Sequence, residues 1–367
     1  MNLVNKKHTI LSIFFILVIT SSFIFSQEKD RYYYYNPKID YGSDLLFNPF
    51  GLLINGSYDM MRVNRFDRSI TKQSYKLGMQ NVNDNLLHPF YHIEHFGYDK
   101  FFKQEFFNFS LDFETAGYMP NIGLHILGNG MEYAKLSEWY DYHNVPYPKL
   151  FSIITTTSYQ YLNEVIENGS YQGTNVDPIA DMLFFNPVGI ILFSFEPIQN
   201  FFSEKLPIYS WPLQPMINPQ NLFIENGGQQ YASRLQITKN ENISLFFNWG
   251  LSAVFGMSYK LENKKNISFG IGGYMNNLVN EEYSENRFVS GYIDYAVGIY
   301  YDKNNSLLSS VLVTGPKAYN LRINVYPNLI NIKGIKPGFF LGVGEMDNFT
   351  FGINIAPIPI GIAGQIR

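Results

Sequence analysis

Hydrophobic positions follow two different periods along this chain of 367 residues. From Tyr231 onward apolar side chains recur at every second position, which is the period of a β-strand. In residues 243–261 one face carries large apolar side chains, and the other carries mostly Ser, Asn, Gly and Lys. This run is longer than the ~9–11 residues that one membrane strand needs. We therefore expect a strand that extends beyond the membrane or bends at Gly250 or Gly256.

Seven further segments repeat the alternation. They are residues 267–274, 289–301, 307–313, 319–325, 339–343, 349–355 and 358–366. Strands with large apolar side chains on one face and small or polar ones on the other are typical of a small transmembrane β-barrel. A soluble β-sandwich with one buried face gives the same pattern and remains the alternative. The chain ends in Gln365, Ile366 and Arg367, without the terminal aromatic residue that bacterial outer-membrane barrels usually carry.

Earlier in the chain the apolar positions follow a helical period. We expect helices over residues 118–140 and 149–168, and a third that Asp177 caps and Pro187 kinks. Each spans roughly 20 residues, a length that can cross a bilayer, pack as a plug or lie along an interface.

Polar side chains interrupt these apolar helices. Acids in such surroundings are costly to bury, so they indicate a functional site. The candidates are His125, Glu132, Glu164, Glu167, Asp181 and Asn186. Such groups either hold helices together through hydrogen bonds or form a catalytic centre. In the second case paired carboxylates do acid–base chemistry, or bind a divalent cation together with His.

A second cluster of histidines lies at residues 88–95, with the sequence HPFYHIEH. On a helix His88, His92 and His95 share one face, which makes them candidate ligands for zinc or another divalent ion. Pro89 makes a helix start here uncertain, and an interfacial turn of aromatic and His side chains is the alternative.

Composition and the N-terminus indicate export. Residues 1–26 have the pattern of a secretory signal, with Lys6 and Lys7 before an apolar run at 10–24 and cleavage near Ser26; an uncleaved anchor is the alternative. Aromatic residues make up 17% of the chain and charged residues only 16%, a bias typical of membrane-interface belts. The net charge of −4 gives no sign of nucleic-acid binding, and zero Cys excludes disulfides and thiolate sites.

These patterns divide the chain into five parts. They are a signal peptide (1–26), a segment rich in Tyr and Asn whose Phe-rich stretches are candidates for strands (27–117), an apolar helical module (118–200), a Pro-rich linker (201–228) and antiparallel barrel strands (229–367).

The order of polar residues in the helical module resembles the VanZ-like and YfiM-like small envelope proteins. The matching positions are His125, Glu164, Glu167, Asp177, Asp181, Asn186 and Gly189, within residues 123–193. The resemblance implies an envelope helical module rather than a particular reaction. By pattern, the C-terminal part resembles uncharacterised Gram-negative outer-membrane barrel proteins.

The expected fold class is therefore α+β, a membrane-associated helical module followed by antiparallel strands that form a small transmembrane barrel. The expected protein resides in the outer membrane after Sec-type export, with the lipid bilayer and the barrel-assembly machinery as partners and a structural or transport-related role. The alternative is an enzyme that acts on a lipid or envelope glycan through His125, Glu164 and Asp181. The sequence lacks a G-x-S-x-G elbow, an H-E-x-x-H motif and a phosphate-binding Gly loop, and it calls for no cofactor.

Overall fold

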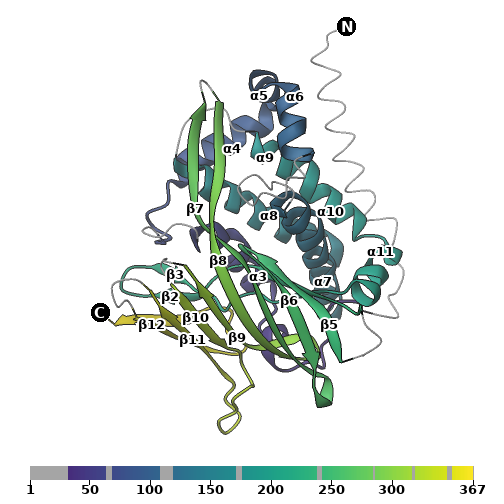
Figure 1. Ribbon diagram of the computed structural model, residues 1–367. Helices are drawn as coiled ribbons and strands as arrows, with labels where there is room; N and C mark the ends of the chain where they lie inside the picture. The colour runs from purple at the N-terminus through teal and green to yellow at the C-terminus, as the bar shows by residue number, and fades with distance from the viewer. Residues whose placement is uncertain are drawn as a thin grey trace.

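The computed structural model describes residues 32–62, 68–107, 119–170, 176–237, 242–283, 286–315, 319–344 and 349–366. They form an α+β protein in which helices gather beside one large curved sheet (Figure 1). The long hairpin of β7 (Lys265–Tyr283) and β8 (Asn286–Lys303) rises along the helices. The expected signal peptide lies outside the described residues.

The N-terminal half is mostly helical from Gly42 onward. Its helices are α2 (Gly42–Leu45), α3 (Pro49–Ser57), the 3₁₀ helix η1 (Asp59–Arg62), α4 (Tyr75–Leu87), α5 (Pro89–Phe96), α6 (Tyr98–Phe101), the π-helices η2 (Phe102–Phe106) and η3 (Met119–Gly128), α7 (Asn129–Tyr142), α8 (Pro148–Glu167), the 3₁₀ helix η4 (Asn168–Ser170), α9 (Asp177–Ala180), the π-helix η5 (Asp181–Phe185), α10 (Asn186–Leu192), α11 (Glu196–Asn200) and the π-helix η6 (Phe201–Lys205). The described part of 27–117 holds no regular strand, so the strands expected there are replaced by helices.

Two of the expected helices begin close to the expected residues. Pro148 stands at the start of α8, and Pro178 stands near the start of α9. Asp177 is the first residue of α9 rather than its cap, since Val176 takes the capping position. Before Pro187 the chain widens into η5, and α10 follows directly. Pro187 has no backbone N–H to donate to the preceding turn, and the wider π-helical turn before it accommodates this missing hydrogen bond.

The C-terminal half forms the sheet. Its strands are β1 (Ile208–Ser210), β2 (Met216–Asn218), β3 (Phe223–Glu225), β4 (Gln230–Leu235), β5 (Ile243–Gly250), β6 (Ser252–Lys260), β7, β8, β9 (Ser306–Thr314), β10 (Leu321–Val325), β11 (Pro337–Val343), β12 (Phe349–Ile355) and β13 (Gly361–Ile366), with a 3₁₀ turn η7 (Glu262–Lys264) between β6 and β7. The long strand expected at 243–261 is instead the hairpin of β5 and β6, which turns at Gly250 and Leu251.

Thirteen described strands form one sheet in the order β1-β4-β5-β6-β7-β8-β9-β10-β11-β12-β13-β2-β3. Consecutive strands from β4 to β13 pair antiparallel, whereas β13 and β2 pair parallel. In the described residues the ladder does not close into the expected barrel, because β1 and β3 remain its two ends. The expected linker supplies these end strands, and residues 211–215 join one end of the sheet to the other.

The segment at 211–215 crosses the inner face of the sheet. The Trp211 indole donates to the Asn305 carbonyl at 2.7 Å, and the Gln214 amide donates to the carbonyls of Val325 and Phe339 at 3.1 and 3.2 Å. Trp211 also packs with Phe246 and Tyr300 in a buried aromatic cluster. The inner face is therefore filled by side chains and by the chain itself.

In a soluble sandwich the apolar side chains of each strand face the core and the polar ones face water, whereas many strand positions here show the opposite arrangement. Large apolar side chains such as Phe255 and Ile271 point outward and are 56% and 61% exposed, whereas Asn248, Ser258 and Ser268 face inward and are buried. Among the described residues no helix is by itself long and apolar enough to cross a membrane, although α9 to α10 and α11 to η6 meet that test as a pair bent by 82°.

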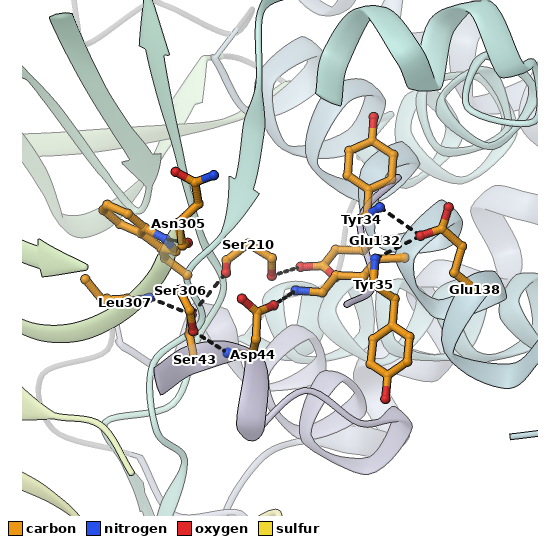
Figure 2. Close-up of polar contacts among 12 residues, drawn as sticks. Tyr34, Tyr35, Ser43, Asp44, Glu132, Glu138, Ser210, Asn305, Ser306 and Leu307 are labelled. Atoms are coloured by element: carbon orange, nitrogen blue, oxygen red, sulfur yellow. Dashed lines mark hydrogen bonds and ion pairs between the residues drawn. The ribbon is translucent and has the colours of Figure 1, made fainter. Parts of the chain in front are cut away.

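The helical module meets the sheet through a polar contact (Figure 2). Glu132 on α7 accepts a hydrogen bond from the Ser210 hydroxyl of β1 at 2.5 Å, and Lys135 pairs with Asp44 at 2.6 Å. The backbone N–H of Asp44 in turn bonds to Ser306 at the start of β9. These bonds link α7, α2 and the sheet in one chain of contacts.

Candidate functional site

His125 is the centre of the candidate site. Its Nε2 lies 3.1 Å from Oδ2 of Asp181, and its Nδ1 lies 3.0 Å from Oδ1 of Asn186. The three residues come from η3, η5 and the first position of α10. The structure thus brings together three of the residues that the sequence indicated, although Asn186 is 61 positions from His125.

Three acids stand beside this group. Glu164 and Glu167 lie one turn apart on α8, and Asp177 begins α9. Each offers a carboxylate oxygen, and these atoms all lie within 4.8 Å of one another. The distance suits ligands of one divalent cation, and carboxylate oxygens are the ligands that Ca²⁺ and Mg²⁺ prefer.

Glu105 on η2 is a further acid of this group. Its carboxyl accepts a long hydrogen bond of 3.4 Å from the Asn121 amide, and its ionisation depends on the charge of Asp181. The sequence analysis did not select Glu105, because it lies in a Phe-rich stretch expected to form strands. An acid within that apolar stretch was the signal that could have found it.

The carboxyls of this cluster resist ionisation. Burial, followed by the charge of Asp181, raises the pKa of Glu105 and of Glu167 to about 7. The same two causes raise the pKa of Glu164 and of Asp177 well above the usual range. A protonated Glu164 can donate a hydrogen bond to Asp181, whose buried Oδ1 receives none from the described residues as they stand. The cluster therefore holds either shared protons or a cation at neutral pH.

The pKa of His125 reflects two opposing causes. Burial lowers the pKa, but the charge of Asp181 and the hydrogen bonds that the imidazole makes to Asp181 and Asn186 raise it by more, so the net result is a raised pKa. Near neutral pH the imidazole is thus poised to carry a proton beside acids that are partly protonated. Groups in this state can act as general acids and bases.

Local backbone irregularities position these groups. His125, Asp181 and Glu105 each lie on a different π-helical segment, a type of turn that is rare and often found at functional sites. Gly189 lets α10 approach η3, because a Cβ on Gly189 would lie 2.6 Å from the Ile126 carbonyl and 2.7 Å from that of His125. A larger residue there would push His125 away from Asp181.

Glu132 lies apart from this cluster. It belongs to the contact with Ser210 described above, and burial raises its pKa to about 7. In an α-helix His125 and Glu132 would share a face, but η3 is a π-helix and its wider turn rotates His125 relative to α7.

The three histidines of residues 88–95 do not converge on one point. Nδ1 of His88 and Nε2 of His92 each lie about 3 Å from a different oxygen of Asp84, and Nδ1 of His95 faces the Tyr91 carbonyl at 2.9 Å. His95 also packs against the Tyr91 ring, with the ring centres 4.0 Å apart.

Comparison with known proteins gives no further assignment. No protein-family model, no curated protein and no solved structure matches the chain.

Proposed function

We propose that this chain is an outer-membrane protein whose sheet turns its outward face to lipid and carries a helical module at one end, in a structural or transport-related role. The outward apolar face is the observation that carries the proposal. It includes Leu245, Phe255, Met257, Phe269, Ile271, Ile299, Val313, Phe351, Ile353 and Ile362, all of them exposed. Water-soluble proteins rarely leave so large a continuous apolar surface uncovered.

The hydrogen bonding of the sheet supports the same proposal. In lipid every backbone donor and acceptor must find a partner within the protein. Every strand from β4 to β13 has a neighbour on each side, although residues 276–283 and 286–294 of the β7–β8 hairpin pair only with each other, and the end strands β1 and β3 have only three residues each. The outer edge of β3 is itself covered, since Ile70 donates to Leu222 and Ile224 donates to Arg68. Apart from β1 and that half of the hairpin, little unpaired strand edge is left to meet lipid.

Membrane fractionation combined with gel mobility tests this proposal. We expect the full-length protein in the outer-membrane fraction, with a mobility in cold detergent that shifts on boiling, because the folded sheet resists detergent. A protein in the soluble periplasmic fraction with no shift would overturn it.

A second candidate function is an enzyme that acts on a lipid or envelope glycan. The observation that favours it is the convergence of His125, Asp181 and Glu164 from segments far apart in the chain. A purely structural role would not require carboxyl groups that titrate near neutral pH to lie next to the imidazole of His125. General acid–base catalysis would use His125 with Asp181, whereas a bound divalent cation would use Glu164, Glu167 and Asp177.

Conservative variants separate the two functions. Asp181→Asn and Glu164→Gln keep the shape of each side chain but remove its charge, and Glu94→Gln on the exposed face of α5 is the control. For an enzyme we expect the heat-modifiable protein at normal abundance with loss of hydrolysis of phosphatidylethanolamine–phosphatidylglycerol vesicles or of isolated envelope glycan. For a structural role we expect less folded protein. If hydrolysis persists in folded variants, the enzyme candidate is wrong.

A further inference from the structure

The inner face of the sheet contains more buried positive charge than negative charge around η1 and β10. Arg62 pairs with Asp59, and Arg68 pairs with Glu225 at 2.8 Å. Arg322 on β10 is 5% exposed, and no hydrogen bond or ion pair joins it to another residue in the described part of the chain. Its guanidinium instead lies over the rings of Tyr319 and Tyr274, at 4.9 and 6.0 Å from their centres.

This imbalance has a physical cost. A guanidinium is charged at every accessible pH, so Arg322 cannot become neutral on burial. An unpaired charge removed from water is strongly destabilising, and a cation–π contact replaces only part of its hydration. The charge of Arg322 lowers the pKa of Asp59, but Asp59 already bonds to Arg62. One positive charge therefore remains without a counter-ion.

A small cavity lies where that charge is unbalanced. Its volume is about 10 Å³, and its polar lining comprises Arg62, Gln230, Ser310, Arg322 and Asn324, beside Tyr300. Nη1 of Arg62 and Nη1 of Arg322 are both buried, and neither donates a hydrogen bond to any of the described residues. The described residues that line the cavity include no Asp or Glu. Two cationic donors thus adjoin a space of about one water molecule.

The surroundings hold Arg62 in this place. Gly228 has a φ of +137° and its missing side chain leaves room for the Arg62 guanidinium, because a Cβ there would collide with it and with Asp59. On the opposite wall Oδ1 of Asn324 accepts from the amides of Asn226 at 2.6 Å and Gln214 at 3.4 Å. The cavity is therefore bounded by fixed side chains rather than by mobile surface residues.

We propose that this cavity binds a single halide-sized anion, such as chloride, between Arg62 and Arg322. A space of about one water molecule favours a single small ion over phosphate, sulfate and carboxylate ligands, which are several times larger. The anion neutralises the surplus guanidinium charge and links η1 to β10.

The test uses the full-length protein folded in detergent. The midpoint of thermal unfolding is measured in sodium gluconate, sodium chloride and sodium bromide at equal ionic strength. We expect chloride and bromide to raise the midpoint saturably relative to gluconate, since only an ion that binds the folded state stabilises it. Arg322→Met should abolish this halide-dependent rise, Arg322→Lys should retain part of it, and Lys103→Met on an exposed helix should leave it unchanged.

A structural measurement decides the case even where Arg322→Met does not fold. Crystals of the wild-type protein grown or soaked in bromide should show an anomalous peak between Arg62 and Arg322. A midpoint equal in gluconate and chloride, or the absence of a bromide peak at this place, would overturn the proposal and assign Asp59 as the shared counter-ion of both arginines.

Discussion

The carboxyl of Glu132 accepts a hydrogen bond of 2.5 Å from the hydroxyl of Ser210, and this bond joins the helical module to the first strand of the sheet. The second oxygen of Glu132 has no donor among the described residues. Burial raises the pKa of this carboxyl from 4.5 to about 7, although Lys135 and Ser210 lower it. The junction between module and sheet therefore responds to pH.

The first prediction concerns that response. Below pH 4.5 Glu132 is protonated in both the folded and the unfolded chain, so it contributes no pH dependence. Between pH 4.5 and about 7 the unfolded chain releases a proton that the folded chain keeps, and stability falls by on the order of 3 kcal/mol at about 1.36 kcal/mol per pH unit. Glu132→Gln should flatten this fall, as measured by unfolding midpoints between pH 4 and 8. Glu94→Gln should keep it, and an equal slope in both variants would contradict the prediction.

The second prediction concerns the N-terminal segment. The Glu138 carboxylate accepts hydrogen bonds from the backbone N–H groups of Tyr33, Tyr34 and Tyr35, each at 2.8 Å. Figure 2 shows the bonds from Tyr34 and Tyr35. Glu138→Gln replaces one acceptor oxygen with a donor, so at least one of these N–H groups loses its partner. We expect a loss of about 1–3 kcal/mol in unfolding free energy and faster chymotrypsin cleavage at these tyrosines. Glu196→Gln, which affects only the exposed bond from the Tyr33 hydroxyl, is the control and should change neither measurement.

The third prediction tests which solvent the outward face of the sheet meets. Ile271 on β7 is 61% exposed, and Ile332 in the loop between β10 and β11 is 54% exposed. If lipid covers the sheet, Ile271→Lys should lower the unfolding free energy in bilayers by about 2–4 kcal/mol, because a charge at the midplane must leave the hydrocarbon or be desolvated. Ile332→Lys should change it by less than about 0.5 kcal/mol. Equal small effects in both variants would show that water covers β7.

The fourth prediction concerns His125 and Asp181. Removing the Asp181 charge leaves burial as the main influence on the imidazole, and burial lowers its pKa. We expect Asp181→Asn to lower the pKa of His125, as followed by NMR of labelled histidine. In the wild type the raised pKa of folded His125 adds stability at low pH, which is lost as the pH rises through that pKa; the variant should lose this dependence. Asp99→Asn, on an exposed helix, should leave the His125 titration unchanged. If Asp99→Asn lowered the His125 pKa as much as Asp181→Asn does, the effect could not be assigned to the contact between His125 and Asp181.

The fifth prediction concerns the approach of α10 to η3. Gly189→Ala places a methyl group against the carbonyls of His125 and Ile126, which are backbone atoms and cannot move aside cheaply. We expect a loss of about 1–3 kcal/mol in stability and a weakened contact between His125 and Asp181, visible as a lower His125 pKa. Gly364→Ala on β13 is the matched control, since no atom lies within 4 Å of its added Cβ. A Gly189→Ala protein with unchanged stability and titration would rule out this packing constraint.

Much of the local structure followed from the sequence. Alternation located the strands from β4 to β13, because in any strand successive side chains point to opposite faces regardless of what packs on them. Pro148 and Asp177 located the starts of two helices, because a proline and an acid are both favoured in the first turn of a helix. A bend at Gly250 was among the expectations, but a reversal of the chain there was not, because a tight turn between two strands preserves the alternation and leaves no break in the pattern.

The site was only partly predictable. Polar residues in apolar helices indicated His125, Glu164, Glu167 and Asp181, since such residues are costly wherever the helix packs. Glu132 was grouped with His125 by an α-helical period that η3 does not follow. Glu105 escaped notice because its neighbours are aromatic and its partners are distant in the chain.

The sequence by itself determined where the strands from β4 to β13 and the helices from η3 to α10 form, and which side chains would be expensive to bury, because both depend on neighbours within a few residues. Only the tertiary structure decided that the apolar face of the sheet points outward, that residues 211–215 join the two ends of the sheet and that Arg322 lies buried without an acid. These features depend on contacts between segments tens to hundreds of residues apart, and no local pattern encodes which of two faces such contacts will cover.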